Sequence, residues 1–157
     1  MAYKEVTTVG PVEWAKVYEH NRDMNGYEGS WTKNEGGYSI LQVLSKEEMA
    51  KLMAAGSSKK AKQARLMDGE IVVGFQRLHK VFNKNGEEIT KAGGAPIVVG
   101  PDNEPFTEII GNGSIAEITN LVSTWQMPDG KTASRTTLQK IKILEHVPYE
   151  VADEDAA

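Results

Sequence analysis

The sequence predicts a single all-β domain with one short helix, built as a small barrel or a sandwich. Three observations lead to this fold class. The chain has 157 residues, which fits one domain with its own core. Apolar, β-branched segments recur along most of its length, separated by turns rich in Gly and Asn. These segments do not alternate with helices, so a parallel α/β sheet is not expected.

The first elements lie in the N-terminal half. Residues 38–44 predict a strand that follows a Gly-rich turn. Ser45 and Glu48 have the spacing of a capping box, and apolar residues then share one helical face, so a helix is predicted over residues 46–55. Residues 57–68 are basic with few apolar positions, and they predict either a loop or a partly helical extension.

Four further strands are expected after this region. They are predicted at residues 71–82, 95–99, 113–125 and 134–147. Asp129-Gly130 is typical of a hairpin turn and would connect the last two strands. Another strand is possible at residues 14–18. We therefore predict a five-stranded OB-fold-like barrel with extended loops and a helix between early strands. Residues 1–149 would form this domain, and residues 150–157 a flexible acidic tail.

Several functional classes find no support in the sequence. There is no cysteine, which excludes disulfides and thiolate metal sites. His20, His79 and His146 are scattered without metal-ligand spacing, and no nucleotide-binding or nucleophile motif occurs. We expect neither a signal peptide nor a membrane span. The sequence predicts a protein that is not an enzyme and uses no metal or cofactor.

The charge is unevenly distributed. The net charge is −4, but residues 30–91 carry +4 and residues 150–157 carry −4. A basic middle with an acidic end either reflects a solvated face and tail or serves an anionic ligand.

Three stretches together resemble the single-stranded DNA-binding proteins of tailed bacteriophages. They are Asn21–Gly29 followed by Gly37-Tyr38, Pro96–Val99 leading to Ile110-Gly111-Asn112-Gly113-Ser114, and the C-terminal strand from Leu138 to Tyr149. The resemblance covers roughly residues 12–150. It implies an OB-fold that binds single-stranded DNA with little sequence preference and supports phage DNA replication and recombination. It also implies a location in the cytoplasm of the infected bacterial host.

The resemblance further implies that the acidic tail binds partner proteins, including phage replication proteins, through Asp153, Glu154 and Asp155. Some relatives end this tail with an aromatic residue, whereas this chain ends in Ala156-Ala157. Docking that needs a terminal aromatic is therefore in doubt. Unpaired edge strands would also allow a homodimer. The alternative function is a phage protein-interaction factor that does not bind DNA.

Binding of single strands without sequence preference needs cations for phosphates and exposed aromatic rings for bases. Phe75, Arg77 and His79 would share one face of a strand and provide both, although Phe75 could equally lie in the core. The aromatic candidates are Tyr27, Trp31, Tyr38, Phe75 and Trp125. The basic candidates are Lys33, Lys59, Lys60, Lys62, Arg65, Arg77, His79, Lys80 and Arg135.

Overall fold

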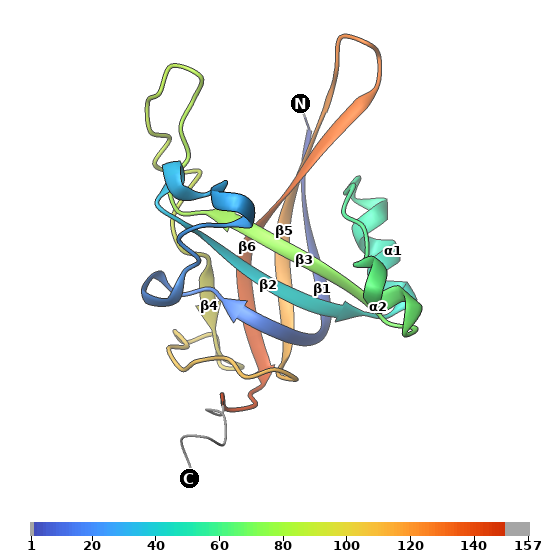
Figure 1. The fold of residues 1–157 in the computed structure, drawn as a ribbon. Coiled ribbons are helices and arrows are strands. Elements are labelled where there is room, and N and C mark those ends of the chain that lie inside the picture. Colours follow the sequence, from blue (N-terminus) through green and yellow to red (C-terminus); the bar gives the residue numbers. More distant parts are fainter. Residues whose placement is uncertain (1, 150–157) are drawn as a thin grey trace.

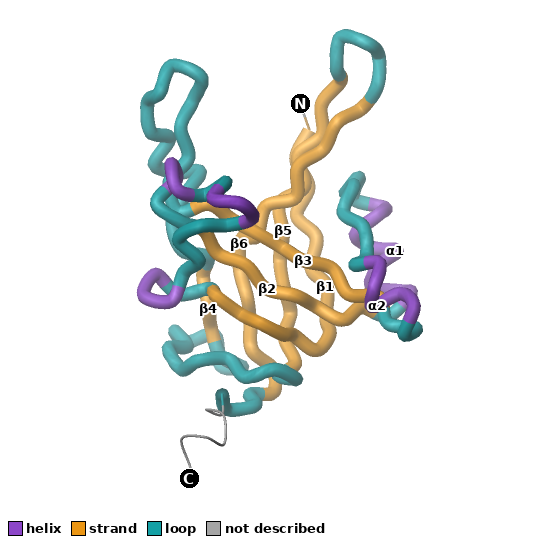
Figure 2. The backbone as a smooth tube through the Cα atoms, viewed as in Figure 1, coloured by secondary structure: helices purple, strands orange, loops and turns teal. Residues whose placement is uncertain are grey.

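The computed structural model describes residues 2–149, which form one six-stranded sheet with two helices (Figures 1 and 2). The strands are β1 (Ala2–Lys16), β2 (Gly37–Leu44), β3 (Ile71–Leu78), β4 (Ile97–Val99), β5 (Ile115–Gln126) and β6 (Thr132–Glu145). The helices are α1 (Lys46–Ala54) and α2 (Gln63–Met67), and three short 3₁₀ turns lie between β1 and β2.

The predicted mainly-β fold is confirmed, with six strands in place of five. The strand order is β3-β2-β1-β5-β6-β4, and all pairs are antiparallel except the short β4 beside β6. The sheet is not closed by hydrogen bonding between its first and last strands. It is therefore a curled, open barrel rather than a complete one.

The long first strand holds the two halves of the sheet together. Residues 2–11 pair with β5, and residues 12–16 pair with β2 (Figure 1). Along β1 the side chains of Val6, Thr8 and Val12 are buried, and most of the side chains between them face outward. The predicted strand at residues 14–18 was thus far too short, since β1 spans Ala2–Lys16. Polar residues occupy many of the outward positions of residues 2–11, so the apolar alternation there is weak in the sequence.

The interior combines an apolar core with one buried polar network. The largest buried side chains include Tyr38, Ile40 and Phe75 from β2 and β3. Gln42 accepts a hydrogen bond from the Thr8 hydroxyl (2.6 Å) and donates to the carbonyls of Thr8 (3.1 Å) and Ala116 (3.0 Å). Gln42 therefore joins β2 to β1 and β5 inside the barrel without leaving its amide unpaired.

Helix α1 packs against β1 and β2, and the predicted capping box is partly confirmed. The Glu48 amide donates to the Ser45 hydroxyl (3.2 Å), while the Glu48 carboxylate accepts from the Val9 amide (2.6 Å). Glu48 thus ties the helix to β1 instead of reaching back to Ser45. Leu52 is the fully buried anchor of this helix. Within residues 2–149, no helix has the length and hydropathy needed to cross a membrane.

Strands β3 and β6 approach each other without forming a ladder, and we call the gap between them the seam. The Arg77 guanidinium of β3 bridges it, donating to the carbonyls of Leu138 (3.4 Å), Gly94 (2.8 Å) and Gly93 (3.0 Å). Burial lowers the pKa of Arg77. Because an arginine guanidinium stays protonated in proteins, the side chain acts here as a donor to three carbonyls.

Residues 57–62, which we call the strap, cross the same seam outside the sheet. At one end Ser57 Oγ lies 2.6 Å from Thr136 Oγ1, and the Ser58 amide donates to Ser134 Oγ (3.1 Å). At the other end the Lys62 amide donates to the Val72 carbonyl of β3 (2.8 Å). The predicted basic loop therefore joins helix α1 to helix α2 along the chain and links β6 to β3 through hydrogen bonds. Only residues 63–67 of the region are helical.

Replacing Arg77 by Met should lower the free energy of unfolding by about 2–4 kcal/mol, because three carbonyls lose a charged donor. Urea denaturation at neutral pH measures the change. Arg135→Met, at an exposed position on β6, serves as the control and should shift stability by less than about 0.5 kcal/mol. Equal stability of the two variants would show that the seam does not depend on Arg77.

Candidate nucleic-acid interface

An open groove of about 500 Å³ lies over the seam. The strap contributes Ser58 and Lys59, and β3 contributes Gln76. The β5–β6 hairpin contributes the remaining lining residues, which are Trp125, Ser134, Arg135 and Thr136. The groove therefore combines one aromatic ring, two cations and several hydroxyl or amide groups.

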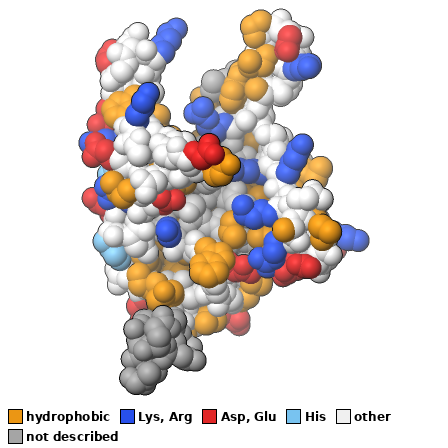
Figure 3. Space-filling view, in the orientation of Figure 1, with side chains coloured by type: hydrophobic (Ala, Val, Ile, Leu, Met, Phe, Trp, Pro, Cys, Tyr) orange, Lys and Arg blue, Asp and Glu red, His pale blue; other side chains and the backbone are white. Residues whose placement is uncertain are grey.

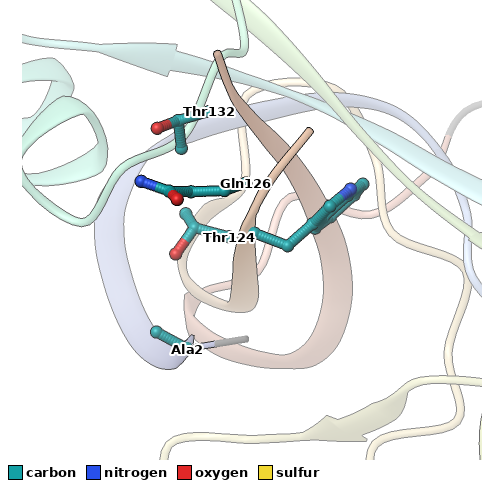
Figure 4. Close-up of a pocket in the computed structure, with 5 residues that line it drawn as sticks. Ala2, Thr124, Gln126 and Thr132 are labelled. Carbon is teal, nitrogen blue, oxygen red and sulfur yellow. The ribbon is translucent and has the colours of Figure 1, made fainter. Parts of the chain in front are cut away.

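Trp125 enters the groove because of its position near the end of β5. It pairs with Ala133 across the hairpin, so strand alternation places Arg135 on its face and Thr124, Gln126, Ser134 and Thr136 on the other, and the groove takes residues from both faces of β6. Figure 4 shows Thr124, Gln126 and Thr132 lying together on that other side, near Ala2. The turn after Trp125 is closed by a hydrogen bond from the Gly130 amide to the Met127 carbonyl (2.9 Å), as the Asp-Gly signal predicts.

Lys59 is half-buried and has no acidic partner among residues 2–149. Burial lowers the pKa of its ammonium, and the neighbouring charge of Lys62 lowers it further. A cation that is partly removed from water beside another cation is destabilising unless an anion compensates it. The electrostatics of the groove therefore favour a negatively charged ligand.

The outer face of β2 and β3 continues from the groove. Ser39 pairs with Gln76, and Leu41 pairs with Gly74, so these four residues share this face. The Lys62 side chain crosses Gly74, where an added Cβ would lie 3.8 Å from Lys62 Cε. On this side of the molecule, several Lys and Arg side chains lie near the centre of the view, among acidic and hydrophobic side chains (Figure 3).

The alternation predicted for β3 is correct, and of the two possibilities left open for Phe75 the structure shows the core. Phe75 is 0% exposed and packs in the core, as does Tyr38 from β2. Gln76 points outward instead. The sequence could not distinguish the two faces, because Phe75 with Arg77 offered a more suggestive pair than the polar Gln76. Neither Phe75 nor Tyr38 presents a ring surface to solvent.

Three predicted cations are occupied by contacts within the protein. Arg77 bridges the seam, as described above. Arg65 pairs with Glu13 (2.9 Å) and Glu70 (2.7 Å), and these hydrogen bonds raise its pKa. Lys80 pairs with Glu35 (2.6 Å). The last pair is exposed enough to be weak.

The imidazole of His79 also has an internal partner, because its Nδ1 lies 2.7 Å from the Tyr38 hydroxyl. Together with Phe75, Arg77 and Tyr38, it makes this part of the predicted site a structural cluster rather than an open surface. Lys60 is exposed on the strap beside Lys59, so the basic cluster of the strap retains Lys59, Lys60 and Lys62 for a ligand.

Trp31, Tyr27 and Lys33 do not line the seam groove, and they lie in the 3₁₀ region between β1 and β2. Trp31 is half-buried, with its ring packed closely against Gly26 and Gly37, where added Cβ atoms would lie 2.5 Å and 2.7 Å from ring atoms. Tyr27 is 82% exposed. Because Gly37 and Ser39 alternate onto the same side of β2, the ring of Trp31 lies at the end of the outer face that continues from the groove.

Sequence reasoning missed the hydroxyl and amide groups of the groove. Ser58, Gln76, Ser134 and Thr136 carry no motif, and polar residues of this kind are ordinary on outward strand positions. Only the path of the strap across the seam brings them together. No group of three or more His, Asp or Glu residues in the described part of the chain could hold a metal ion.

Lys59→Met should keep or raise the stability of the protein, because it removes a partly buried charge. The pKa of Lys59 is lowered in the folded state, so its destabilising effect is fully present near pH 7. The stability gain of the variant should shrink as the pH rises towards about 10.4, the usual lysine value. Thermal unfolding at pH 7 and pH 10 tests this, with exposed Lys60→Met as the control. A clear loss of stability at pH 7 would contradict the assignment.

Comparison with known proteins identifies the fold. No protein-family model matches the sequence, and no curated protein matches it. Among solved structures, the chain is similar to gp2.5, a single-stranded DNA binding protein encoded by bacteriophage T7, with a TM-score of 0.58 and 14% identity. That alignment covers 98% of this chain and 93% of gp2.5.

A second solved structure gives the same result. The single-stranded DNA-binding protein from bacteriophage Enc34, in a C-terminally truncated form, aligns with a TM-score of 0.54 and 12% identity. This alignment covers 94% of this chain and 88% of that protein. The expected likeness to the phage proteins is thus confirmed for the fold.

Proposed function

We propose that this protein binds single-stranded DNA without marked sequence preference, using the seam groove and the adjoining outer face of β2 and β3. The observation that carries the proposal is Lys59, a half-buried and unpaired cation beside Trp125 and Arg135 in one open groove. The fold shared with two phage proteins of this activity supports it.

Each part of the groove has a role in such binding. Lys59, Lys62 and Arg135 would neutralise phosphates, and Trp125 would stack on a base, which is worth about 1–3 kcal/mol. Ser58 and Gln76 would add hydrogen bonds to sugars or base edges. A stacking ring needs a base face that is free, and in a duplex both faces of each base are covered by neighbours. The arrangement therefore favours single strands over duplexes.

The wider biological role is an extension of this activity. We propose that the protein acts without catalysis in phage DNA replication and recombination, in the cytoplasm of the infected host. Asp153, Glu154 and Asp155 would contact phage replication proteins, and a homodimer would use a free sheet edge. The acidic tail lies outside the described residues, so its role remains a prediction from the sequence.

Substitutions in the groove should weaken DNA binding in two distinguishable ways. Arg135→Ala should reduce affinity for oligo-dT. The plot of log K against log salt should also become less steep, its negative slope shrinking in magnitude by about 0.7, because one phosphate contact is lost. Trp125→Ala should weaken binding roughly 5- to 150-fold with little change in slope, because stacking releases no counterions. Fluorescence anisotropy of a labelled oligonucleotide at several salt concentrations measures both effects.

The control lies on the same strand as Arg135. Lys142 is seven residues further along β6, roughly 23 Å away at the usual strand rise. Lys142→Ala should leave affinity within about twofold of the unaltered protein. Equal losses for Arg135→Ala and Lys142→Ala would indicate diffuse charge attraction instead of binding in the groove.

A further inference from the structure

We infer that the DNA-binding surface extends onto β1, where Trp14 stacks on an additional base. This inference rests on the proposed function and adds a contact that the groove itself does not contain.

Trp14 has an unusual conformation for a large residue. It lies at a bulge in β1, where the register with β2 shifts between Glu13 and Lys16. Its φ is +51°, in the left-handed region that bulky side chains rarely adopt, and it is 65% exposed. A mostly exposed ring contributes little to the core, so packing does not explain why this strained position carries tryptophan. Strain of this kind is concentrated at functional sites.

A neighbouring turn holds the bulge in place. The Trp14 amide donates to Asn112 Oδ1 (2.8 Å). Two residues earlier, the Val12 amide donates to the Ser114 carbonyl (2.8 Å), and the Val12 carbonyl accepts from the Gly113 amide (2.9 Å). The Gly-Asn-Gly-Ser turn that stands out in the sequence therefore fixes the backbone on both sides of Glu13, and it directs the ring of Trp14 outward.

Trp14 lies beside the outer face that leads to the groove. Lys16 pairs with Ser39, which pairs with Gln76, and Gln76 lines the groove. Two strand spacings, about 10 Å, separate β1 from β3 along this row. A DNA strand leaving the groove across this face would therefore reach the bulge within a short distance.

The charges along this path suit a phosphate backbone. Lys16 is exposed on β1, and Lys62 crosses β3 at Gly74. The one acidic group next to Trp14 on the strand, Glu13, is paired with Arg65 at 2.9 Å, and this hydrogen bond holds the pKa of Glu13 below its usual value. The carboxylate is thus compensated and would repel a phosphate only weakly.

The test replaces Trp14 by Gly and by Phe and measures affinity for oligo-dT together with thermal stability. Gly adopts φ +51° without strain, so Trp14→Gly should unfold at the same temperature as the unaltered protein or higher. Its affinity should fall roughly 5- to 150-fold. Trp14→Phe should recover most of the affinity. Ile97→Ala, an exposed apolar position on β4, is the control and should bind normally.

A second measurement detects the contact directly. In a Trp31→Phe, Trp125→Phe variant, Trp14 is the remaining tryptophan, and its emission should be quenched by oligo-dT to saturation. Unchanged affinity of Trp14→Gly, or emission that DNA does not alter, would overturn the inference while leaving the groove intact. If the unaltered protein failed to bind oligo-dT, the proposed function itself would be contradicted, which is a different result.

Discussion

The architecture depends on one constraint, namely that β3 and β6 meet at the seam without pairing. A sheet that curls this far must satisfy the groups along its open edges or leave them to water. Here Arg77 closes the inner side by donating to three carbonyls, and the strap covers the outer side through Ser57, Ser58 and Lys62. The strap thereby brings Lys59 to the groove, so the same segment that covers the unpaired seam also contributes to the candidate site.

The sequence was informative where a local pattern determines local structure. The Ser45 cap, the Asp129-Gly130 hairpin and the β-branched run of β5 each identify their elements because turn geometry and strand propensity act over a few residues. It was less informative where partners are distant. Residues 2–11 form a strand because they pair with β5. The inward position of Phe75 follows from the curl of the whole sheet. Arg65 and Arg77 looked like free cations, since nothing in the sequence places Glu13 or the carbonyls of Gly93 and Leu138 beside them.

Two residues illustrate how binding and stability would oppose each other in this protein. Lys59 has a lowered pKa because it is partly buried beside Lys62, and Trp14 has a left-handed backbone with an exposed ring. Neither arrangement stabilises the free protein. If the proposed binding holds, both would become favourable when a phosphate approaches the ammonium and a base covers the indole. Such features are expected where selection acts on a ligand-bound state rather than on the free fold.

The most direct test of the central claim is a titration of the unaltered protein with oligo-dT, followed by its tryptophan fluorescence at low and moderate salt, with a duplex of equal length as the comparison. Single-stranded DNA binding through the seam groove predicts saturable quenching that weakens as salt increases and is much smaller with the duplex. Equal binding to both forms would contradict selection for free base faces. No binding to either form would contradict the account and favour a protein-interaction factor.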